Sequence, residues 1–177
     1  MQGLAPERVI YIGSFSKILF PALRLGYMIL PPVLVEPCRA IKHIQDNHAP
    51  ILAQLTLARF IEEGYLERHI AKMKKIYRTK RDLLINQLKA AFQDQIKISI
   101  SGESTGLHLI AEFPEILFDN EMQDKIKKAG IIIHPVSEHT LQENCHQSKI
   151  ILGYSHLSHQ EIAAGVARLK GALELVM

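Results

Sequence analysis

Residues 8–31, RVIYIGSFSKILFPALRLGYMILP, decide the fold of this chain. The β-branched and aromatic residues of 8–15 predict a buried strand, and the small residues that follow predict a turn. Residues 23–30 predict a second strand, which must end at Pro31 because proline has no N–H for a sheet ladder. The stretch therefore predicts two strands that flank a loop, and this loop contains Lys17.

The next part of the chain has helical periodicity. Two helices are predicted over residues 33–47 and 51–60. An apolar stripe then runs from Leu66 to Leu88 at multiples of the helical repeat, which predicts one long amphipathic helix over residues 65–92.

The polar face of this long helix is rich in cations. Against Glu67 and Asp82 it carries a set of basic residues: Arg68, Lys72, Lys74, Lys75, Arg78, Lys80 and Arg81. The simplest interpretation is a solvated helix face. The alternative is a contact with DNA, which must weaken as the salt concentration is raised.

After residue 93 strands and helices alternate, which predicts α/β structure. Short strands are expected over residues 96–100, 107–113, 131–133 and 149–152. A short helix is expected over 121–129, with Asp119 or Asn120 as its N-cap. Glu161 stands three residues after Ser158 and ahead of an apolar run, and this capping-box pattern predicts a C-terminal helix.

Composition places the chain among average soluble proteins. Of its 177 residues 47% are apolar and 22% are charged, which excludes disordered and fibrous classes. The net charge of +3 is too small to argue for nucleic-acid binding by itself. The first 30 residues contain no apolar run of membrane-spanning length, so we expect a cytoplasmic protein without membrane contact.

The cysteines and histidines predict neither disulfides nor metal binding. Cys38 and Cys145 lie far apart and form no CxxC pair, so we expect reduced thiols. His134, His139, Cys145 and His146 fall in one polar segment, but their spacing matches no zinc pattern. A solvated loop is the expected structure there.

The chemistry is expected in the loop after the first strand. Ser14-Phe15-Ser16-Lys17 places an amine beside two hydroxyls, and Arg24 follows seven residues after the lysine. A lysine amine forms an imine with an aldehyde, hydroxyls donate to a phosphate, and a guanidinium binds a phosphate through a bidentate fork. Pyridoxal 5'-phosphate carries an aldehyde and a phosphate, so this pattern predicts it as the cofactor.

Residues 8–31 as a whole closely resemble the Schiff-base lysine region of fold-type I aminotransferases, in particular the aminotransferase-like domain of MocR-type regulators of the GntR family. The likeness covers essentially the whole chain and includes further landmarks: Gln54, Glu63-Gly64, His69-Ile70-Ala71-Lys72-Met73, Tyr77, Arg81, Gly106-Leu107-His108-Leu109 and Ile151-Leu152-Gly153-Tyr154. It implies that Lys17 is the catalytic lysine that bonds to the cofactor. By the same resemblance Ser14 and Ser16 are phosphate-loop hydroxyls and Arg24 is the phosphate arginine.

The resemblance also implies the architecture. The expected fold is α/β, the C-terminal fragment of the fold-type I PLP-dependent transferase fold, with part of the large-domain sheet, a long linker helix and a small α/β domain. In that division residues 1–50 are the terminal part of the PLP-binding large domain. Residues 51–93 are interdomain helices, and residues 94–177 are the small C-terminal domain.

One departure from the family concerns position. The family's lysine lies well past the middle of the catalytic module, whereas here it is residue 17. The acidic partner of the pyridine nitrogen, the aromatic residue stacked on the ring and the regulators' winged helix-turn-helix all belong upstream. We therefore expect the C-terminal portion of a larger protein, inactive when isolated, with DNA contacts only through the absent N-terminal module and a homodimer at full length.

Three functions follow from these observations. The leading one is an effector domain of a transcription regulator that binds a small amine or amino acid. The second is the C-terminal part of a true aminotransferase acting on amino acids, so turnover by the complete protein stays open. Ile151 favours the regulator, because related sequences often have an arginine there that binds a substrate carboxylate. The third is a purely structural domain without a ligand.

Overall fold

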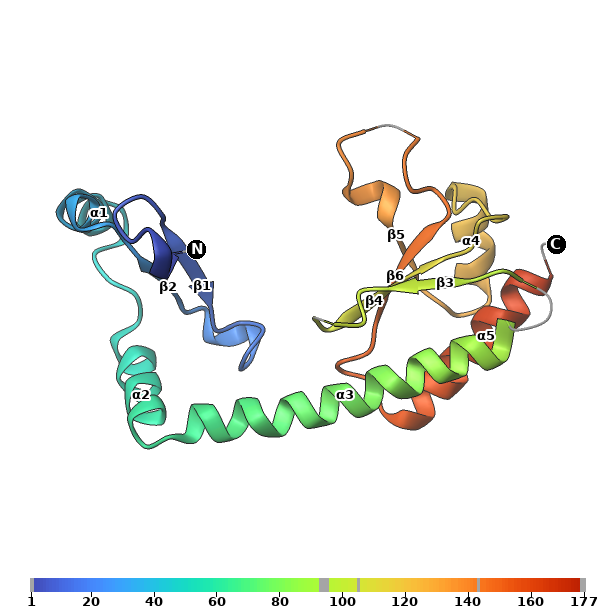
Figure 1. Cartoon of the computed structure of the whole chain (residues 1–177), viewed down its shortest axis with the longest axis horizontal. Helices are drawn as coiled ribbons and strands as arrows, with labels where there is room; N and C mark the ends of the chain where they lie inside the picture. The colour runs from blue at the N-terminus through green and yellow to red at the C-terminus, as the bar shows by residue number, and fades with distance from the viewer. Residues whose placement is uncertain (1, 93–95, 105, 143, 176–177) are drawn as a thin grey trace. The chain divides into compact units, whose positions relative to one another are not determined.

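The computed structural model describes residues 2–92, 96–104, 106–142 and 144–175 (Figure 1). The chain forms two compact units, Met1–Lys72 and Met73–Met177. Helix α3 (Tyr65–Phe92) belongs to both, and its bounds are those predicted from the apolar stripe. The boundary expected between residues 93 and 94 lies outside the described residues.

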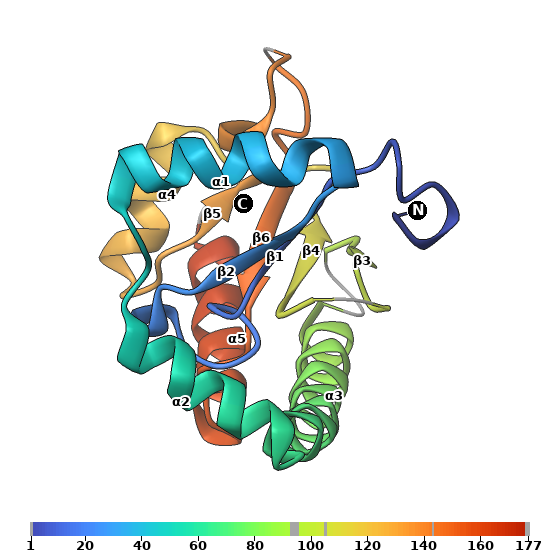
Figure 2. The same cartoon turned by 90° about the vertical axis from the view of Figure 1, so that its left-hand side faces the viewer.

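The first unit begins with an antiparallel pair of strands, β1 (Tyr11–Ser14) and β2 (Gly26–Ile29), seen side by side in Figure 2. Helices α1 (Pro32–Asp46) and α2 (Ile51–Glu62) follow. Short 3₁₀ turns cover Gln2–Leu4 and Pro21–Leu23. The structure confirms both predicted helices and both strands, although each strand is shorter than expected.

The prediction that the first strand is buried is wrong. The side chain of Ile12 is 72% exposed, and Met28 on the neighbouring strand is 54% exposed. Among the described residues of this unit the buried hydrophobic ones are Leu25 and Leu57. The reason is that a two-stranded ribbon is buried only when another layer packs against it.

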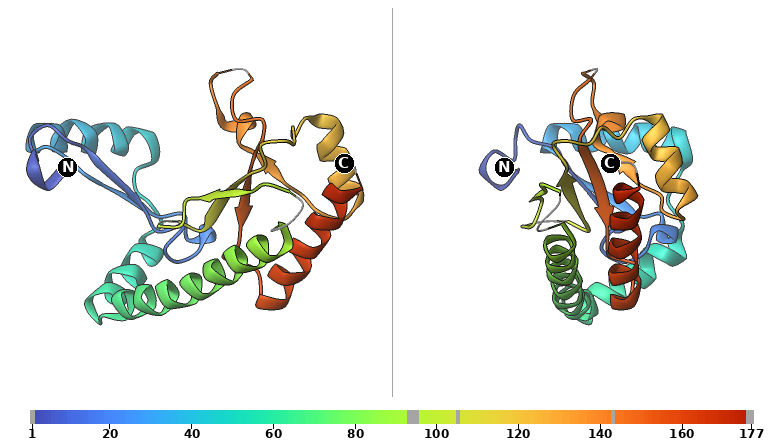
Figure 3. Two further views of the ribbon diagram at one scale, coloured as in Figure 1. Left: turned by 45° about the vertical axis from the view of Figure 1, so that its right-hand side comes forward. Right: turned by 90° about the vertical axis from the view of Figure 1, so that its right-hand side faces the viewer.

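The second unit is built on a four-stranded antiparallel sheet in the order β3-β4-β6-β5. The strands are β3 (Ser99–Ser101), β4 (His108–Glu112), β5 (His134–Pro135) and β6 (Lys149–Gly153). A 3₁₀ turn over Val136–His139 follows β5. Helices α4 (Asn120–Lys128) and α5 (His159–Glu174) lie on the same side of the sheet (Figure 3).

One hydrophobic cluster forms the core of this unit. Alternate residues of β4, Leu109 and Ala111, point into it and are completely buried, as is Ile150 on β6. The C-terminal half of α3 and the later helices also contribute buried residues to the cluster, among them Leu84, Leu88, Phe92, Ile126, Ile162, Val166, Leu169 and Leu173. The core therefore lies between the sheet and its helices.

Capping residues set the helix boundaries in the second unit. The Asp119 carboxylate accepts a hydrogen bond from the Met122 N–H at 2.9 Å, so Asp119 is the N-cap of α4. Ser158 and Glu161 form the predicted capping box of α5.

The strand predicted over residues 131–133 is wrong. After α4 the Gly130 N–H donates to the Lys127 carbonyl, and the Ile131 N–H donates to the Ile126 carbonyl. These bonds bind the segment to the end of the helix, so pairing with β6 begins only at His134, opposite Ile151. Within the described residues no helix has the length and apolar character needed to cross a bilayer.

Candidate functional site

The predicted lysine loop is closed by the strand pair that flanks it. Ser14 is the last residue of β1 and pairs with Gly26 of β2. One step further the Phe15 N–H donates to the Leu25 carbonyl at 3.1 Å. Leu25, whose carbonyl accepts this bond, is only 6% exposed. The paired residues Ser14–Gly26 and Phe15–Leu25 therefore close the loop over residues 15–25, and we call this closed end its neck.

Lys17 lies in a tight turn beyond this neck. The Phe15 carbonyl accepts hydrogen bonds from the N–H groups of Ile18 at 3.1 Å and Leu19 at 2.8 Å. The Ser14 Oγ accepts from the Ser16 N–H at 3.2 Å, so the Ser14 hydroxyl proton stays free to donate to a ligand. The Lys17 side chain is exposed. It takes part in no ion pair with the residues that the structure describes.

Arg24 occupies an unusual backbone conformation. Its φ of 51° and ψ of 32° are left-handed, and its N–H donates to the Pro21 carbonyl at 3.4 Å. This conformation costs a residue with a Cβ about 1–2 kcal/mol. It places Arg24 beside the bond between Phe15 and Leu25, across the neck from Ser14. The structure thus brings Ser14 and Arg24 to one end of the loop.

His69, one of the residues that resemble the family, contacts the lysine turn. From α3 its Nε2 lies 3.1 Å from the Ile18 carbonyl oxygen, one residue beyond Lys17. Because a carbonyl only accepts hydrogen bonds, Nε2 must carry the proton in this contact. The bond ties the lysine turn to the helix. The signal available in the sequence was a histidine next to Ile70 in the first turns of the long helix.

Aromatic rings pack beside the neck. The Tyr27 ring lies 5.9 Å from Tyr11 and 5.4 Å from Phe15, measured between centroids. It also covers Gly13 so closely that an added Cβ there would collide with it. The hydrogen bond with the Tyr11 side chain, more than burial, raises the pKa of Tyr27. The rings thus stiffen the strands that carry the loop.

Residues 2–169 match the family Aminotransferase class I and II. The chain belongs to this family. Two curated relatives are transcription regulators: the uncharacterised HTH-type transcriptional regulator YhdI of Bacillus subtilis, 35% identical over 97% of this chain and 36% of its own length, and the probable rhizopine catabolism regulatory protein MocR of Rhizobium meliloti, 30% identical over 97% and 34%. The chain spans about a third of the length of these relatives.

Among solved structures, the α-aminoadipate aminotransferase LysN of Thermus thermophilus matches with a TM-score of 0.80 and 26% identity, over 98% of this chain and 44% of LysN. That structure contains N-(5'-phosphopyridoxyl)-L-leucine. Both regulators are more similar in sequence to this chain than LysN is.

These comparisons confirm three expectations from the sequence. The α/β fold of the fold-type I transferases is confirmed, as is the similarity to MocR-type regulators. Pyridoxal phosphate is confirmed as the cofactor of the family to which the chain belongs. The roles of Ser14, Ser16, Lys17 and Arg24 stay predictions, as does the division at residues 50 and 93.

The residues of the loop fit part of this cofactor. Two serines and an arginine, the residue types that bind a phosphate, lie in or beside the loop, and an exposed amine lies in its turn. Residues 14–30 contain no acidic side chain to compete with the phosphate. The residue types of the loop therefore suit the phosphate and the aldehyde of this cofactor.

The other candidate residues have ordinary surroundings. Cys38 and Cys145 are free thiols, and the Cys145 Sγ lies 3.5 Å from the Gln142 side-chain oxygen. Over the described ranges no three His, Cys, Asp or Glu residues come together as a metal site. Ile151 lies in β6 between Ile110 and His134, and its aliphatic side chain offers no cation to a carboxylate.

The basic face of α3 is not simply solvated. Arg68 donates to the Glu63 carbonyl at 3.1 Å and lies 4.5 Å above the Tyr65 ring. Lys80 donates to the Ser155 carbonyl at 2.9 Å. These two cations therefore have structural partners within the chain.

Proposed function

We propose that this chain is the C-terminal part of an aminotransferase-like effector domain in a GntR/MocR-type transcription regulator, and that Lys17 holds pyridoxal phosphate there. The observation that carries the proposal is the closed loop between β1 and β2, which contains Ser16, Lys17 and Arg24 and begins directly after Ser14. The regulator relatives support the choice of function, since their similarity extends over nearly the whole chain.

The proposal gives a role to each of the predicted site residues and to His69. Pyridoxal phosphate, when bound, supplies an aldehyde that condenses with amines and a ring that draws electrons from the bonded amine. Lys17 provides the amine that holds the cofactor in place. Arg24 binds the phosphate through a bidentate fork, and the serine hydroxyls donate to it. His69 positions Lys17 through the Ile18 carbonyl.

The proposed effector is a small amine or amino acid. An incoming amine competes with Lys17 for the same aldehyde, and the difference in affinity between two conformations is what shifts a regulator. Because Ile151 offers no positive charge, the effector is expected to depend little on an α-carboxylate. DNA binding is assigned to a winged helix-turn-helix upstream of this chain, and the complete protein is expected to be a cytoplasmic homodimer.

The test uses the complete protein with pyridoxal phosphate. Borohydride reduction followed by peptide mass spectrometry is expected to find the pyridoxyl label on Lys17. The variant Lys17→Arg keeps the charge and must lose the label. The matched control is Lys72→Arg, which changes an exposed lysine of α3 and must retain it. A label that survives in Lys17→Arg contradicts the cofactor assignment.

A true aminotransferase is the second candidate, and the match to LysN favours it. The two functions differ in whether amino donors are consumed. Amino acids added to the complete holoprotein should convert the cofactor to its amine form and release a keto acid if the protein is an enzyme. The regulator is expected instead to change its affinity for DNA without releasing keto acid.

A further inference from the structure

A basic cleft lies beside α3 in the second unit, and none of its lining residues belongs to the lysine loop. It has a volume of about 520 Å³. It is lined by residues of α3, of the connection between β3 and β4, and of the segment after β6: Lys74, Tyr77, Arg78, Arg81, Glu103, Ser104, Gly106 and Tyr154. A cavity of this size accommodates a small molecule.

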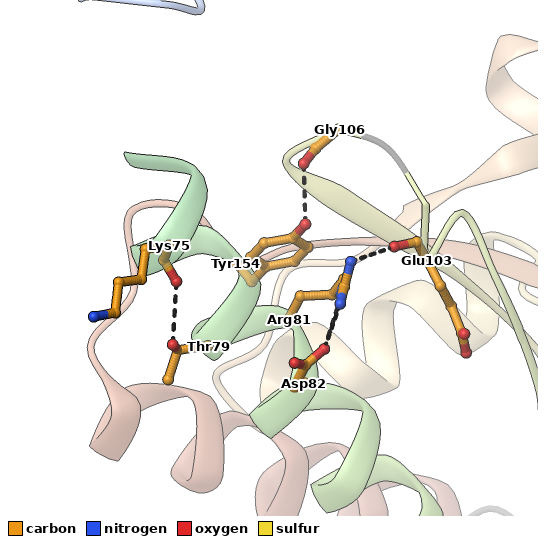
Figure 4. A network of polar contacts seen from close by, with 7 residues as sticks. All are labelled: Lys75, Thr79, Arg81, Asp82, Glu103, Gly106 and Tyr154. Carbon is orange, nitrogen blue, oxygen red and sulfur yellow. Dashed lines mark hydrogen bonds and ion pairs between the residues drawn. The ribbon is translucent and has the colours of Figure 1, made fainter. Parts of the chain in front are cut away.

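The cations of the cleft come from one face of the helix. Lys74, Arg78 and Arg81 are spaced by four and three residues, so their side chains follow one another along α3. Arg81 is held rigidly, because it donates to the Glu103 carbonyl at 2.6 Å and to the Asp82 carboxylate at 2.6 and 2.9 Å (Figure 4). The cleft thus begins with one fixed guanidinium.

The opposite wall is fixed by Tyr154. This residue is 2% exposed, and its hydroxyl donates to the Gly106 carbonyl at 3.0 Å. Gly106 adopts a φ of 91°, which favours glycine, so the connection turns sharply at this point. Figure 4 shows the Glu103 carboxylate pointing away from the Arg81 guanidinium. The hydrogen bond between Tyr154 and Gly106 therefore holds this wall of the cleft in place through contacts within the protein.

The charges of the cleft are unbalanced. Its lining carries three cations and one carboxylate, that of Glu103. Arg81 is already paired with Asp82, whereas Lys74 and Arg78 are exposed and form no ion pair with the residues that the structure describes. An arginine fork beside a lysine point charge matches the oxygens and the double charge of a phosphate monoester.

We propose that this cleft binds the phosphate group of a small molecule, through Arg78 and Lys74 beside the fixed Arg81. The concave shape argues for a small ligand over a DNA duplex, and Lys80 and Arg68 of the same helix already have partners within the chain. The residues of this site are separate from those of the lysine loop, so the failure of either assignment leaves the other intact.

The experiment is an NMR titration of the 177-residue chain, with inorganic phosphate and then with glycerol 3-phosphate. Saturable shifts are expected at the backbone amides of Ser104 and Gly106 and at the Arg78 guanidinium. The double variant Lys74→Gln/Arg78→Gln is expected to weaken binding about tenfold or more, since hydrogen bonds to charged groups are lost. Arg78→Lys keeps the charge without the guanidinium fork, and its affinity is expected to lie between those of the wild type and the double variant.

The matched control is Lys75→Gln. It removes the same charge from the neighbouring position, and Figure 4 shows the Lys75 ammonium pointing away from Arg81 and Tyr154. Binding to this variant is expected to change less than about twofold. Amide spectra without ligand report whether each variant keeps its fold.

Three results would overturn the proposal. One is the absence of saturable shifts with both ligands in a chain whose amide spectrum shows a folded second unit. Another is equal weakening by Lys75→Gln and the double variant, which would indicate non-specific attraction to the helix. The last is a competition result, in which a short DNA duplex displaces glycerol 3-phosphate at a lower concentration than inorganic phosphate needs. That result would assign the basic face of α3 to nucleic-acid binding.

Discussion

The two units of the chain bury their apolar residues to very different extents. In the second unit Leu88, Phe92 and Leu109 are at most 1% exposed. In the first unit Ile44 is 86% and Leu52 is 80% exposed, although both lie in well-formed helices. Apolar periodicity thus produces helices in both units, but burial requires a second layer to pack against. The first unit consequently depends on contacts that its own residues do not supply.

The largest expected difference compares one substitution in two helices. Leu88→Ala removes a fully buried side chain from the core and is expected to cost about 2–5 kcal/mol of unfolding free energy. Leu55→Ala changes a leucine that is 64% exposed in α2 and is expected to cost less than about 0.5 kcal/mol. Chemical denaturation followed by circular dichroism measures both. Equal costs would contradict the contrast between the units.

A smaller effect is expected in the strand pair of the first unit. A Cβ at Gly26 would meet the Gly13 carbonyl oxygen at 2.9 Å, so Gly26→Ala must push the strands apart. The expected loss is about 1–3 kcal/mol of local stability. Hydrogen exchange at the Phe15 amide reports it. Gly3→Ala is the control, because nothing lies within 4 Å of its added Cβ, and protection of Phe15 should be unchanged there.

The cap of α5 tests the second unit at its edge. Ser158→Ala is expected to cost about 1 kcal/mol, because the Glu161 N–H loses its acceptor. The return bond from the Ser158 N–H to the Glu161 carboxylate lowers the pKa of Glu161 below its ordinary value of 4.5. Because the pKa is lowered in the folded state, the stabilisation by this carboxylate is complete above pH 4.5. It is lost as the pH falls through the lowered pKa.

Glu161→Gln should therefore flatten the acid side of the stability curve. Thermal unfolding of both proteins from neutral pH downward measures this difference. An identical decline in the wild type and the variant would argue against the carboxylate's role in the cap.

An effect of similar size is expected at Tyr154. Tyr154→Phe removes the hydrogen bond to Gly106 and is expected to cost about 1 kcal/mol. Burial, partly opposed by Arg81, raises the pKa of Tyr154 above 10.0. The wild type should thus hold this contribution below pH 10 and lose it as the pH rises through the raised pKa. Stability measured across alkaline pH should fall less steeply in the variant, and parallel curves would contradict the assignment.

Much of the secondary structure could be predicted because its signals are local. The apolar stripe from Leu66 to Leu88 defined α3, and the Ser158 capping box defined the start of α5. The errors concern partners instead. The strand at residues 8–15 was expected to be buried because its residues are apolar, but the side chains of Tyr11 and Ile12 are exposed. Residues 131–133 are β-branched, yet the Ile131 N–H donates back to α4 and pairing with β6 begins only at His134.

The candidate site divides in the same way. Ser14, Ser16, Lys17 and Arg24 could be selected because they lie within eleven consecutive residues. The contact between His69 and Ile18 joins positions 51 residues apart, and the Arg81 bond to the Glu103 carbonyl joins positions 22 apart. Such contacts depend on how elements pack, which periodicity within one segment does not encode.

The left-handed backbone at Arg24 sets two requirements against each other. A glycine there would relax the main chain, because it adopts this conformation without a steric penalty, and its greater freedom in the unfolded chain offsets part of that gain. The same replacement would remove the guanidinium from the loop. Arg24→Gly is therefore expected to relieve backbone strain and to weaken phosphate binding. Selection for robustness alone would not keep an arginine at this position.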